Sequence, residues 1–394
     1  MLRSHRLLIA MVGSTVLLGE LFSSALAPLL PRYVDAYGLS DAELGLFVAT
    51  EAIGSIAAVP FAAWAVWRFG ARSVTVAGLV GTGAASVAFG FADTVWLLDL
   101  SRGAVGVAGT FAWAAGFAWL SEGIAPTRRA RSIGLVVGAA AAGALLGPGL
   151  GVAGAHVGVT ALFGFVGAIA VALALVAARL PAPSGREATP LRVIRARMVR
   201  QPLGAWLWLG WIVVLPALLW SVLLVQVPVR LDETGLPPAA IGALFVGTSL
   251  LDLVVSPLVG WWADTRGRTA PLRTGTLVVG VGAALAALLG ATVAVVATTF
   301  AMAAGAMLLA APTLALLADS FEALELPYEV AFAGQTLGWA VGNLAGALGS
   351  GVLAGLAGAG APFAVVAALS LATCAGIARG RWASPGESRP PAAG

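Results

Sequence analysis

The sequence predicts an all-α membrane protein, with twelve transmembrane helices in two pseudo-symmetric six-helix bundles. Hydrophobic residues make up 60% of the 394 residues, charged residues make up 10%, and the mean hydropathy is +0.97. Soluble domains carry about 25% charged residues, so this composition belongs in a bilayer. A spanning helix needs roughly 20 mostly apolar residues, and short polar breaks divide the chain into about a dozen such runs.

An internal repeat predicts the two bundles. It is clearest at two charged turns that follow apolar runs, and its offset of 197 positions is half of the 394-residue chain. The offset relates three residues of the first turn to three of the second, namely Pro60, Trp64 and Gly70 to Pro257, Trp261 and Gly267. A repeat of this length in so apolar a chain indicates two homologous membrane halves.

The predicted spans follow in order from the N-terminus. They cover residues 7–30, 42–66, 74–92, 96–119, 131–153, 158–179, 204–228, 239–262, 272–290, 293–318, 330–354 and 359–379. We expect the first run to be a helix and not a cleaved signal peptide, because Glu20 interrupts it and Pro28 follows the site that resembles a cleavage site.

The domain organisation follows from these spans. We expect an N-terminal bundle over residues 1–180, a linker over 181–203, a C-terminal bundle over 204–380 and a disordered tail over 381–394. The linker is rich in proline and arginine, and it predicts a short basic helix that faces anionic lipid.

The arginines predict the orientation. All 22 basic residues are arginine, and a cytoplasmic N-terminus with twelve spans places 19 of them in the cytoplasm. Arg32 and Arg230 then lie outside and Arg102 within a span. This is the positive-inside pattern, so we expect both termini and the linker in the cytoplasm of a cell that carries the protein in its plasma or inner membrane.

Several classes of function are excluded. Cys374 is the single cysteine, and the only histidines are His5 and His156, so we expect no disulfide framework and no metal cluster. No catalytic constellation is visible, and a chain without lysine has no phosphate-binding Gly-Lys-Ser/Thr motif. We therefore expect no enzyme, no cofactor and no nucleic-acid partner.

Three motifs resemble those of the major facilitator superfamily, over nearly the whole chain. The loop at 260–268, with Gly260, Asp264, Arg266, Gly267 and Arg268, resembles the family's signature loop. The segment 98–109 around Arg102 resembles its fourth-helix arginine motif, and the segment 143–151, with Gly143, Gly147, Pro148 and Gly151, resembles the fifth-helix motif of proton-coupled exporters. The resemblance implies a secondary transporter of the drug or metabolite antiporter branch.

Two features of these motifs stay open. The first-half loop carries Trp67 where the family's aspartate stands, so the resemblance leaves a cytoplasmic latch in that half in doubt. Gly143, Gly147 and Gly151 form a stripe that lets two helices approach closely. Either the stripe serves helix packing alone, or it also governs how the two halves rock against each other. Residues 338, 342 and 346 repeat the stripe in the second half, with Asn343 in the place of Pro148.

Charged residues within spans are the best candidates for function, because each costs about 3 kcal/mol at a helix centre. They are Glu20, Glu51, Arg102 and Asp252. Each also has a structural interpretation: Arg102 pairs locally with Asp99 or with Glu51, and Asp252 is a hydrogen-bonding group. The family resemblance points to Glu20 as the proton-binding or cation-binding acid.

Deep aromatic and polar residues suggest a cavity between the halves, although buried tryptophan often serves packing. The candidates are Trp113, Trp220, Gln335, Trp339 and Asn343. We expect a monomer that exports an amphiphilic or cationic small molecule in exchange for protons, by alternating access. The alternatives are a proton-coupled or facilitative transporter of a sugar, amino acid or secreted metabolite, and a receptor or scaffold that does not transport.

Overall fold

The computed structural model describes residues 2–124, 126–182, 191–199, 202–326 and 328–379, and the regular elements among them are helices. The first half contains α1 (Leu2–Ser24), the 3-10 helix η1 (Ala27–Leu29), α2 (Leu30–Tyr37), α3 (Asp41–Phe69), α4 (Ala71–Gly90), α5 (Val95–Gly123), α6 (Pro126–Val157) and α7 (Val159–Arg179). The remainder contains α8 (Leu191–Val199), α9 (Leu203–Asp232), α10 (Pro238–Arg266), α11 (Thr269–Leu288), α12 (Thr292–Ala323), α13 (Tyr328–Ala357) and α14 (Ala361–Ala378).

Among the described residues, 12 helical segments are long and apolar enough to cross a membrane. The first, His5–Tyr37, combines α1, η1 and α2, and each of the others is a single helix. Every span expected from the sequence overlaps one of these segments. The prediction of an all-α membrane protein with twelve spanning helices is therefore confirmed.

Contacts between Cα atoms divide the chain into two compact units. The first unit comprises residues 1–187, 224–250 and 347–356, and the second comprises residues 188–223, 251–346 and 357–394. The expected bundle and linker boundaries stay a prediction, and the expected disordered tail lies outside the described residues.

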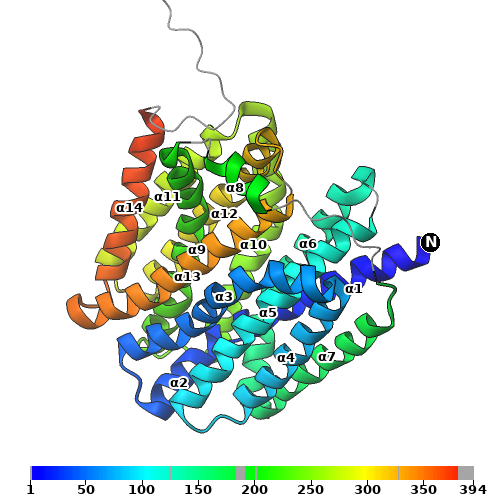
Figure 1. Ribbon diagram of the computed structural model, residues 1–394. Helices are drawn as coiled ribbons and strands as arrows, with labels where there is room; N and C mark the ends of the chain where they lie inside the picture. Colours follow the sequence, from blue (N-terminus) through cyan, green and yellow to red (C-terminus); the bar gives the residue numbers. More distant parts are fainter. Residues whose placement is uncertain (1, 125, 183–190, 200–201, 327, 380–394) are drawn as a thin grey trace, which may run out of the picture. The chain divides into compact units, whose positions relative to one another are not determined.

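The first unit packs around α4 and α5. Helix α5 lies against α3 and α4, α4 also lies against α7, and α1 lies against α6 (Figure 1). An aromatic cluster joins these helices, since the Phe89 ring centroid is 4.6 Å from that of Phe163 and 5.6 Å from that of Phe22. Tyr33 and Phe47 extend the cluster, with ring centroids 5.4 Å apart.

The second unit packs α11 against α12 and α14. Its core includes Trp208 and Phe321, and Met198 of the short helix α8 packs against that core. The Trp206 Nε1 atom donates to the Met198 carbonyl (3.0 Å), and Arg197 forms an ion pair with Glu325 (3.1 Å). These contacts hold α8 on the second unit.

The repeat is visible in the backbone of the turns. Gly70 and Gly267, which end α3 and precede α11, have φ angles of +82° and +81°. Gly38 and Gly235, which also stand 197 positions apart, have φ angles of +62° and +81°. Residues other than glycine rarely adopt this conformation, so the repeat preserves turn geometry as well as hydrophobic pattern.

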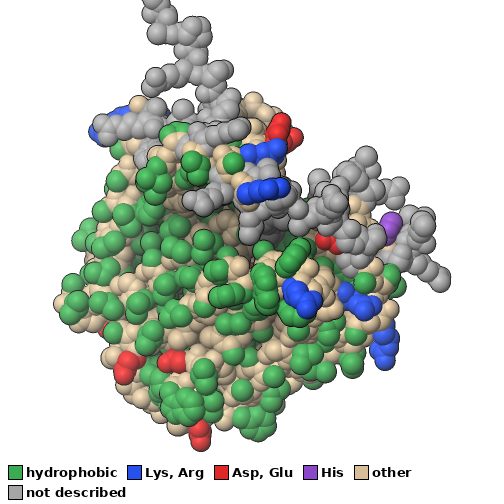
Figure 2. Space-filling model, viewed as in Figure 1, with side chains coloured by type: hydrophobic (Ala, Val, Ile, Leu, Met, Phe, Trp, Pro, Cys, Tyr) green, Lys and Arg blue, Asp and Glu red, His purple; other side chains and the backbone are tan. Residues whose placement is uncertain are grey.

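The exposed surface suits lipid. Figure 2 shows hydrophobic side chains spread over the visible face, with charged groups in small clusters. Large apolar side chains are exposed to an extent that water would penalise, such as Leu288 and Leu356, which are 81% and 82% exposed. Hydrocarbon in contact with these helices removes that penalty.

Candidate functional site

The first unit contains an ion pair within its spanning helices. The Arg102 Nη2 atom of α5 lies 2.9 Å from the Glu51 Oε2 atom of α3. The Arg102 side chain is only 3% exposed, whereas the Glu51 side chain is 24% exposed. Of the two pairings left open by the sequence, the structure has Arg102 paired with Glu51 and not with Asp99.

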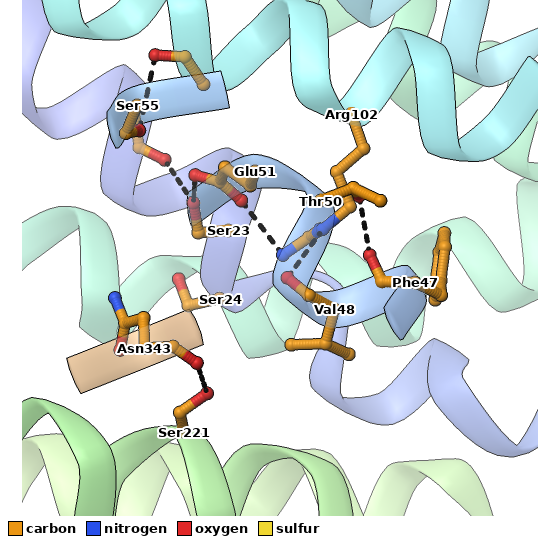
Figure 3. Close-up of polar contacts among 12 residues, drawn as sticks. Ser23, Ser24, Phe47, Val48, Thr50, Glu51, Ser55, Arg102, Ser221 and Asn343 are labelled. Atoms are coloured by element: carbon orange, nitrogen blue, oxygen red, sulfur yellow. Dashed lines mark hydrogen bonds and ion pairs between the residues drawn. The ribbon is translucent and has the colours of Figure 1, made fainter. Parts of the chain in front are cut away.

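Helix α1 supplies a third member of this network. The Ser23 hydroxyl donates to the Glu51 Oε1 atom over 2.6 Å, so the carboxylate lies between Ser23 and Arg102 (Figure 3). Both bonds are charge-assisted, and such bonds are stronger than neutral ones. Glu51 thus accepts from Ser23 and pairs with Arg102 at the same time.

Close packing of α3 and α5 makes the pair possible. A Cβ atom on Gly106 would lie 2.0 Å from the Glu51 carbonyl oxygen, so a side chain there would push the helices apart. The Ser55 hydroxyl also crosses this interface and donates to the Gly106 carbonyl (3.3 Å). The glycine that follows the arginine by four positions thus brings Glu51 within reach of Arg102.

The guanidinium of Arg102 has one enclosed nitrogen without a partner. Its Nε atom donates to the Val48 carbonyl (3.4 Å), and its Cζ atom lies 5.6 Å from the centre of the Phe47 ring. The Nη1 atom is buried and makes no hydrogen bond. An unpaired buried donor carries a desolvation cost, so a further acceptor that bonded to this nitrogen would be stabilised.

Glu20 lies on α1, half-buried, one turn before Ser23 and Ser24. Its carboxyl group is close enough to that of Glu51 for the two to interact electrostatically. Its backbone carbonyl accepts a hydrogen bond from the Ser24 hydroxyl. Within the described part of the chain, the Glu20 carboxyl makes no hydrogen bond or ion pair. Two acids and one arginine thus share one region of the first unit.

The fifth-helix motif packs α6 against α1, the helix that carries Glu20. Cβ atoms on Gly143 and Gly151 would lie 2.3 and 2.1 Å from the carbonyl oxygens of Leu17 and Ala25. A Cβ atom on Gly147 would lie 2.0 Å from the Ser24 hydroxyl. The motif therefore fixes the distance between α1 and α6, and Pro148 lies inside α6 beside it.

The second unit has its own polar group where α9 meets α13. In the amide orientation that satisfies both neighbours, Asn343 donates to the Ala217 carbonyl (3.0 Å) and accepts from the Trp339 Nε1 atom (3.2 Å). The Ser221 hydroxyl donates to the Asn343 carbonyl over 2.9 Å. Asn343 thus connects a tryptophan to the neighbouring helix.

The remaining cavity candidates are divided between the units. Gln335 lies two turns before Asn343 on α13, Trp220 lies on α9, and both are partly exposed. Trp113 lies on α5 of the first unit, where its ring packs against Phe117 with centroids 5.6 Å apart. A common cavity for all five residues stays a prediction.

Asp252 differs from Glu20 in its local contacts. It is half-buried on α10, and the Ser256 hydroxyl, one turn later on the same helix, donates to its carboxylate. Because Asp252 accepts a hydrogen bond from its own helix, it fits a structural role as a hydrogen-bonding group as well as a role in transport.

The loop between α10 and α11 forms one ion pair in the second unit. Arg268 pairs with Asp319 of α12, the acid that the repeat places 197 positions after Glu122. Asp264 and Arg266 are exposed and make no hydrogen bond or ion pair with a described residue, and Gly260 lies within α10.

Sequence reasoning missed two partners. Ser23 lies one turn after Glu20 on α1, but its bond to Glu51 depends on how α1 meets α3, which the sequence does not show. Sequence reasoning also did not predict the pair between Arg197 and Glu325. Tertiary packing sets both contacts, and neither has a local spacing that would have indicated it.

Comparison with known proteins decides the family. The model of the Major Facilitator Superfamily matches residues 12–229 and residues 209–394, which together cover nearly the whole chain. The chain belongs to the Major Facilitator Superfamily. It is therefore a multi-pass membrane transporter, as the three sequence motifs predicted.

Relatives and solved structures of the Major Facilitator Superfamily agree. The chain is 30% identical over 165 residues to Multidrug resistance protein 2 of Bacillus subtilis (strain 168), a match that spans 41% of each protein. The fold is shared with the xylose transporter XylE from E. coli in a partially occluded inward open conformation (TM-score 0.75, 14% identity, 95% of this chain and 99% of that chain). It is also shared with a bacterial homologue of the human lysosomal transporter Spinster (TM-score 0.72, 14% identity, 95% of both chains).

Proposed function

We propose that this transporter exports an amphiphilic or cationic small molecule in exchange for protons, by alternating access. The observation that carries the proposal is the Glu51 carboxylate, held inside the first unit between Ser23 and Arg102 and beside Glu20. Ionisable groups within a membrane bundle are costly and are retained mainly for transport of ions and protons.

Competition for negative charge provides the coupling. A cationic substrate is attracted by ionised carboxylates, and a proton bound to the same group removes that attraction. Linkage makes the effect reciprocal, because a substrate that favours the ionised acid must bind more weakly once the acid is protonated. Glu20 is the acid best suited to this exchange, because its carboxyl has no hydrogen-bond partner among the described residues. The Glu51 carboxylate already has two partners, Ser23 and Arg102.

Two observations support the substrate class. The Bacillus subtilis relative is named a multidrug resistance protein, although the match spans less than half of its length. Tryptophans also occur near these groups: Trp339 donates to Asn343, and the Trp113 Nε1 atom lies close to Gly19, the residue before Glu20 on α1. Aromatic faces beside acidic groups bind cations through the ring quadrupole and through charge.

Transport into liposomes with an acidic lumen tests the proposal. The purified full chain is reconstituted, and uptake of the lipophilic cation ethidium is followed by fluorescence. Proton antiport predicts accumulation several-fold above that in protein-free liposomes, and nigericin, which dissipates the pH gradient, abolishes it. Radiolabelled xylose is the comparison solute. Uptake of xylose in place of ethidium supports the sugar alternative, and absence of any flux contradicts transport of either class.

A further inference from the structure

A second carboxylate lies within reach of the Arg102 guanidinium. Asp99 stands three residues before Arg102 on α5, and acid and base at this spacing are neighbours on a helix surface. The carboxyl of Asp99 interacts electrostatically with the guanidinium, as do Glu51 and the Tyr33 hydroxyl. Arg102 thus faces two acids, of which it contacts one.

The polar atoms near Arg102 that lack partners form a matched set. The Nη1 atom of Arg102, the Oδ1 atom of Asp99 and the Oη atom of Tyr33 are all enclosed and make no hydrogen bond. Arg102 and Tyr33 are only 2% and 5% exposed. Nη1 is a donor and Oδ1 an acceptor, so both would be satisfied by a contact that the present arrangement leaves unmade.

The three groups lie at the same end of the first unit. Asp99 is in the second turn of α5, and Tyr33 lies one turn before the end of α2. The Tyr37 hydroxyl donates to the Ala92 carbonyl (3.1 Å) and so joins α2 to the turn that precedes α5. Phe47 lies between the groups, since both the Tyr33 ring and the Arg102 guanidinium pack against its ring.

We propose that Asp99 is the alternate ion-pair partner of Arg102, which the guanidinium contacts when Glu51 takes up a proton. Protonation removes the charge that holds Arg102 to Glu51 and leaves a buried cation without a counter-ion. Reorientation of the guanidinium toward Asp99, one turn earlier on α5, restores an ion pair and releases Glu51 of α3. The proposed function assigns the exchanged proton to Glu20, so this proposal is separate from it and requires only that Glu51 can also bind a proton.

The charged and titratable neighbours of the pair are few enough to name. They are Glu20 on α1, Tyr33 on α2 and Asp99 on α5. The groups that interact electrostatically with Arg102 are Glu51, Tyr33 and Asp99, and a neutral phenol does not replace a lost carboxylate. Asp99 is therefore the group that lowers the cost of protonating Glu51.

A double-mutant cycle tests the exchange without substrate or transport. The variants are Glu51→Gln, Asp99→Asn and their combination, and the measurement is the thermal unfolding midpoint of the purified full chain. Each single variant leaves Arg102 one carboxylate, so each lowers the thermal unfolding midpoint modestly. The double variant leaves a buried unpaired guanidinium, so its midpoint falls several degrees further than the sum of the two.

Asp93→Asn is the matched control, because Asp93 is an exposed acid at the same end of the first unit. Its combination with Glu51→Gln is expected to be additive. Additivity of Asp99→Asn with Glu51→Gln, or an equal excess with Asp93→Asn, overturns the proposal.

A second measurement holds if the double variant does not fold. Infrared spectroscopy of the reconstituted protein follows the protonated carboxyl band of Glu51, identified by its loss in Glu51→Gln. Without Asp99, Arg102 has no other partner and keeps Glu51 ionised, so the band appears about one pH unit lower in Asp99→Asn. Asp99→Glu restores the pH midpoint of this band, and Asp93→Asn leaves that pH midpoint nearly unchanged. An unchanged pH midpoint in Asp99→Asn overturns the exchange, whereas absence of proton-driven flux in wild type overturns only the proposed function.

Discussion

Ser24 and Ser221 occupy equivalent positions in the two halves of the chain, 197 residues apart, and each donates its hydroxyl to a carbonyl of the helix packed against it. Ser24 reaches the Gly143 carbonyl of α6 (3.4 Å), and Ser221 reaches the Asn343 carbonyl of α13 (2.9 Å). Each bond sits in a glycine-lined contact between two spanning helices. The repeat thus reproduces a specific helix-to-helix contact and not only a hydrophobic pattern.

The first prediction concerns this glycine contact. Gly143→Val is expected to destabilise the protein by about 1 to 3 kcal/mol, because the added side chain meets the α1 backbone and forces the helices apart. Thermal unfolding of the purified protein measures the loss. Gly149→Val is the matched control on the same helix, where an added Cβ meets nothing within 4 Å. Equal loss in both variants contradicts a packing role for Gly143.

Polar pairing differs between the halves although the packing repeats. The offset of 197 places Thr248 at the position of Glu51 and Thr299 at that of Arg102. Each threonine is buried and donates to a carbonyl of its own helix, Phe245 (2.8 Å) and Val295 (2.7 Å). The Glu51–Arg102 ion pair therefore has no counterpart at the equivalent positions of the second half.

Much of the fold could be predicted from the sequence, because hydrophobic runs are local signals that the bilayer enforces. The site was less predictable. In the structure, Gly342 of α13 is the counterpart of Gly143 of α6. Gly143 approaches the Leu17 carbonyl of α1, Gly342 approaches the Val214 carbonyl of α9, and Leu17 and Val214 are 197 positions apart. The order of the glycines in the sequence instead pairs Gly143 with Gly338, one turn earlier. A stripe of small residues fixes the face of a helix but not its register against the neighbour.

The choice of partner for Arg102 has a similar explanation. The sequence offered Asp99 on the same helix and Glu51 on another. Local spacing alone favours Asp99, whereas the tight contact at Gly106 brings Glu51 within 2.9 Å. The energy of a buried pair depends on such tertiary contacts, which a single sequence does not reveal.

The second prediction concerns membrane orientation. Single cysteines replace the exposed residues Thr265 and Thr234 in a background that carries Cys374→Ser. The arginine distribution predicts that an impermeant thiol reagent labels position 234 in intact cells and position 265 only after the membrane is opened. Mass shift of the purified protein measures the labelling, and the reverse pattern would contradict cytoplasmic termini.

The third prediction concerns the loop between α10 and α11. Asp264→Asn is expected to slow initial transport several-fold, whereas its first-half counterpart Trp67→Ala stays near the wild-type rate. Both side chains are exposed, and surface substitutions usually change stability by about 0.5 kcal/mol or less, so the unfolding midpoints should stay nearly unchanged. A slowed rate at unchanged stability indicates gating. Negligible effects of both substitutions on the initial rate show that the loop has no gating role here.

The last prediction concerns Glu20. Glu20→Gln keeps the size of the side chain and removes its titration, so ethidium accumulation driven by an acidic lumen should fall to the level of protein-free liposomes. Exchange of ethidium down its own gradient, with no pH difference, should persist if the glutamine still permits binding. Asp252→Asn is the matched control, a half-buried acid on α10 that already accepts a hydrogen bond from Ser256. Accumulation by Glu20→Gln at the wild-type rate and with the wild-type pH dependence would assign coupling to Glu51 or Asp252 and leave Glu20 a structural residue.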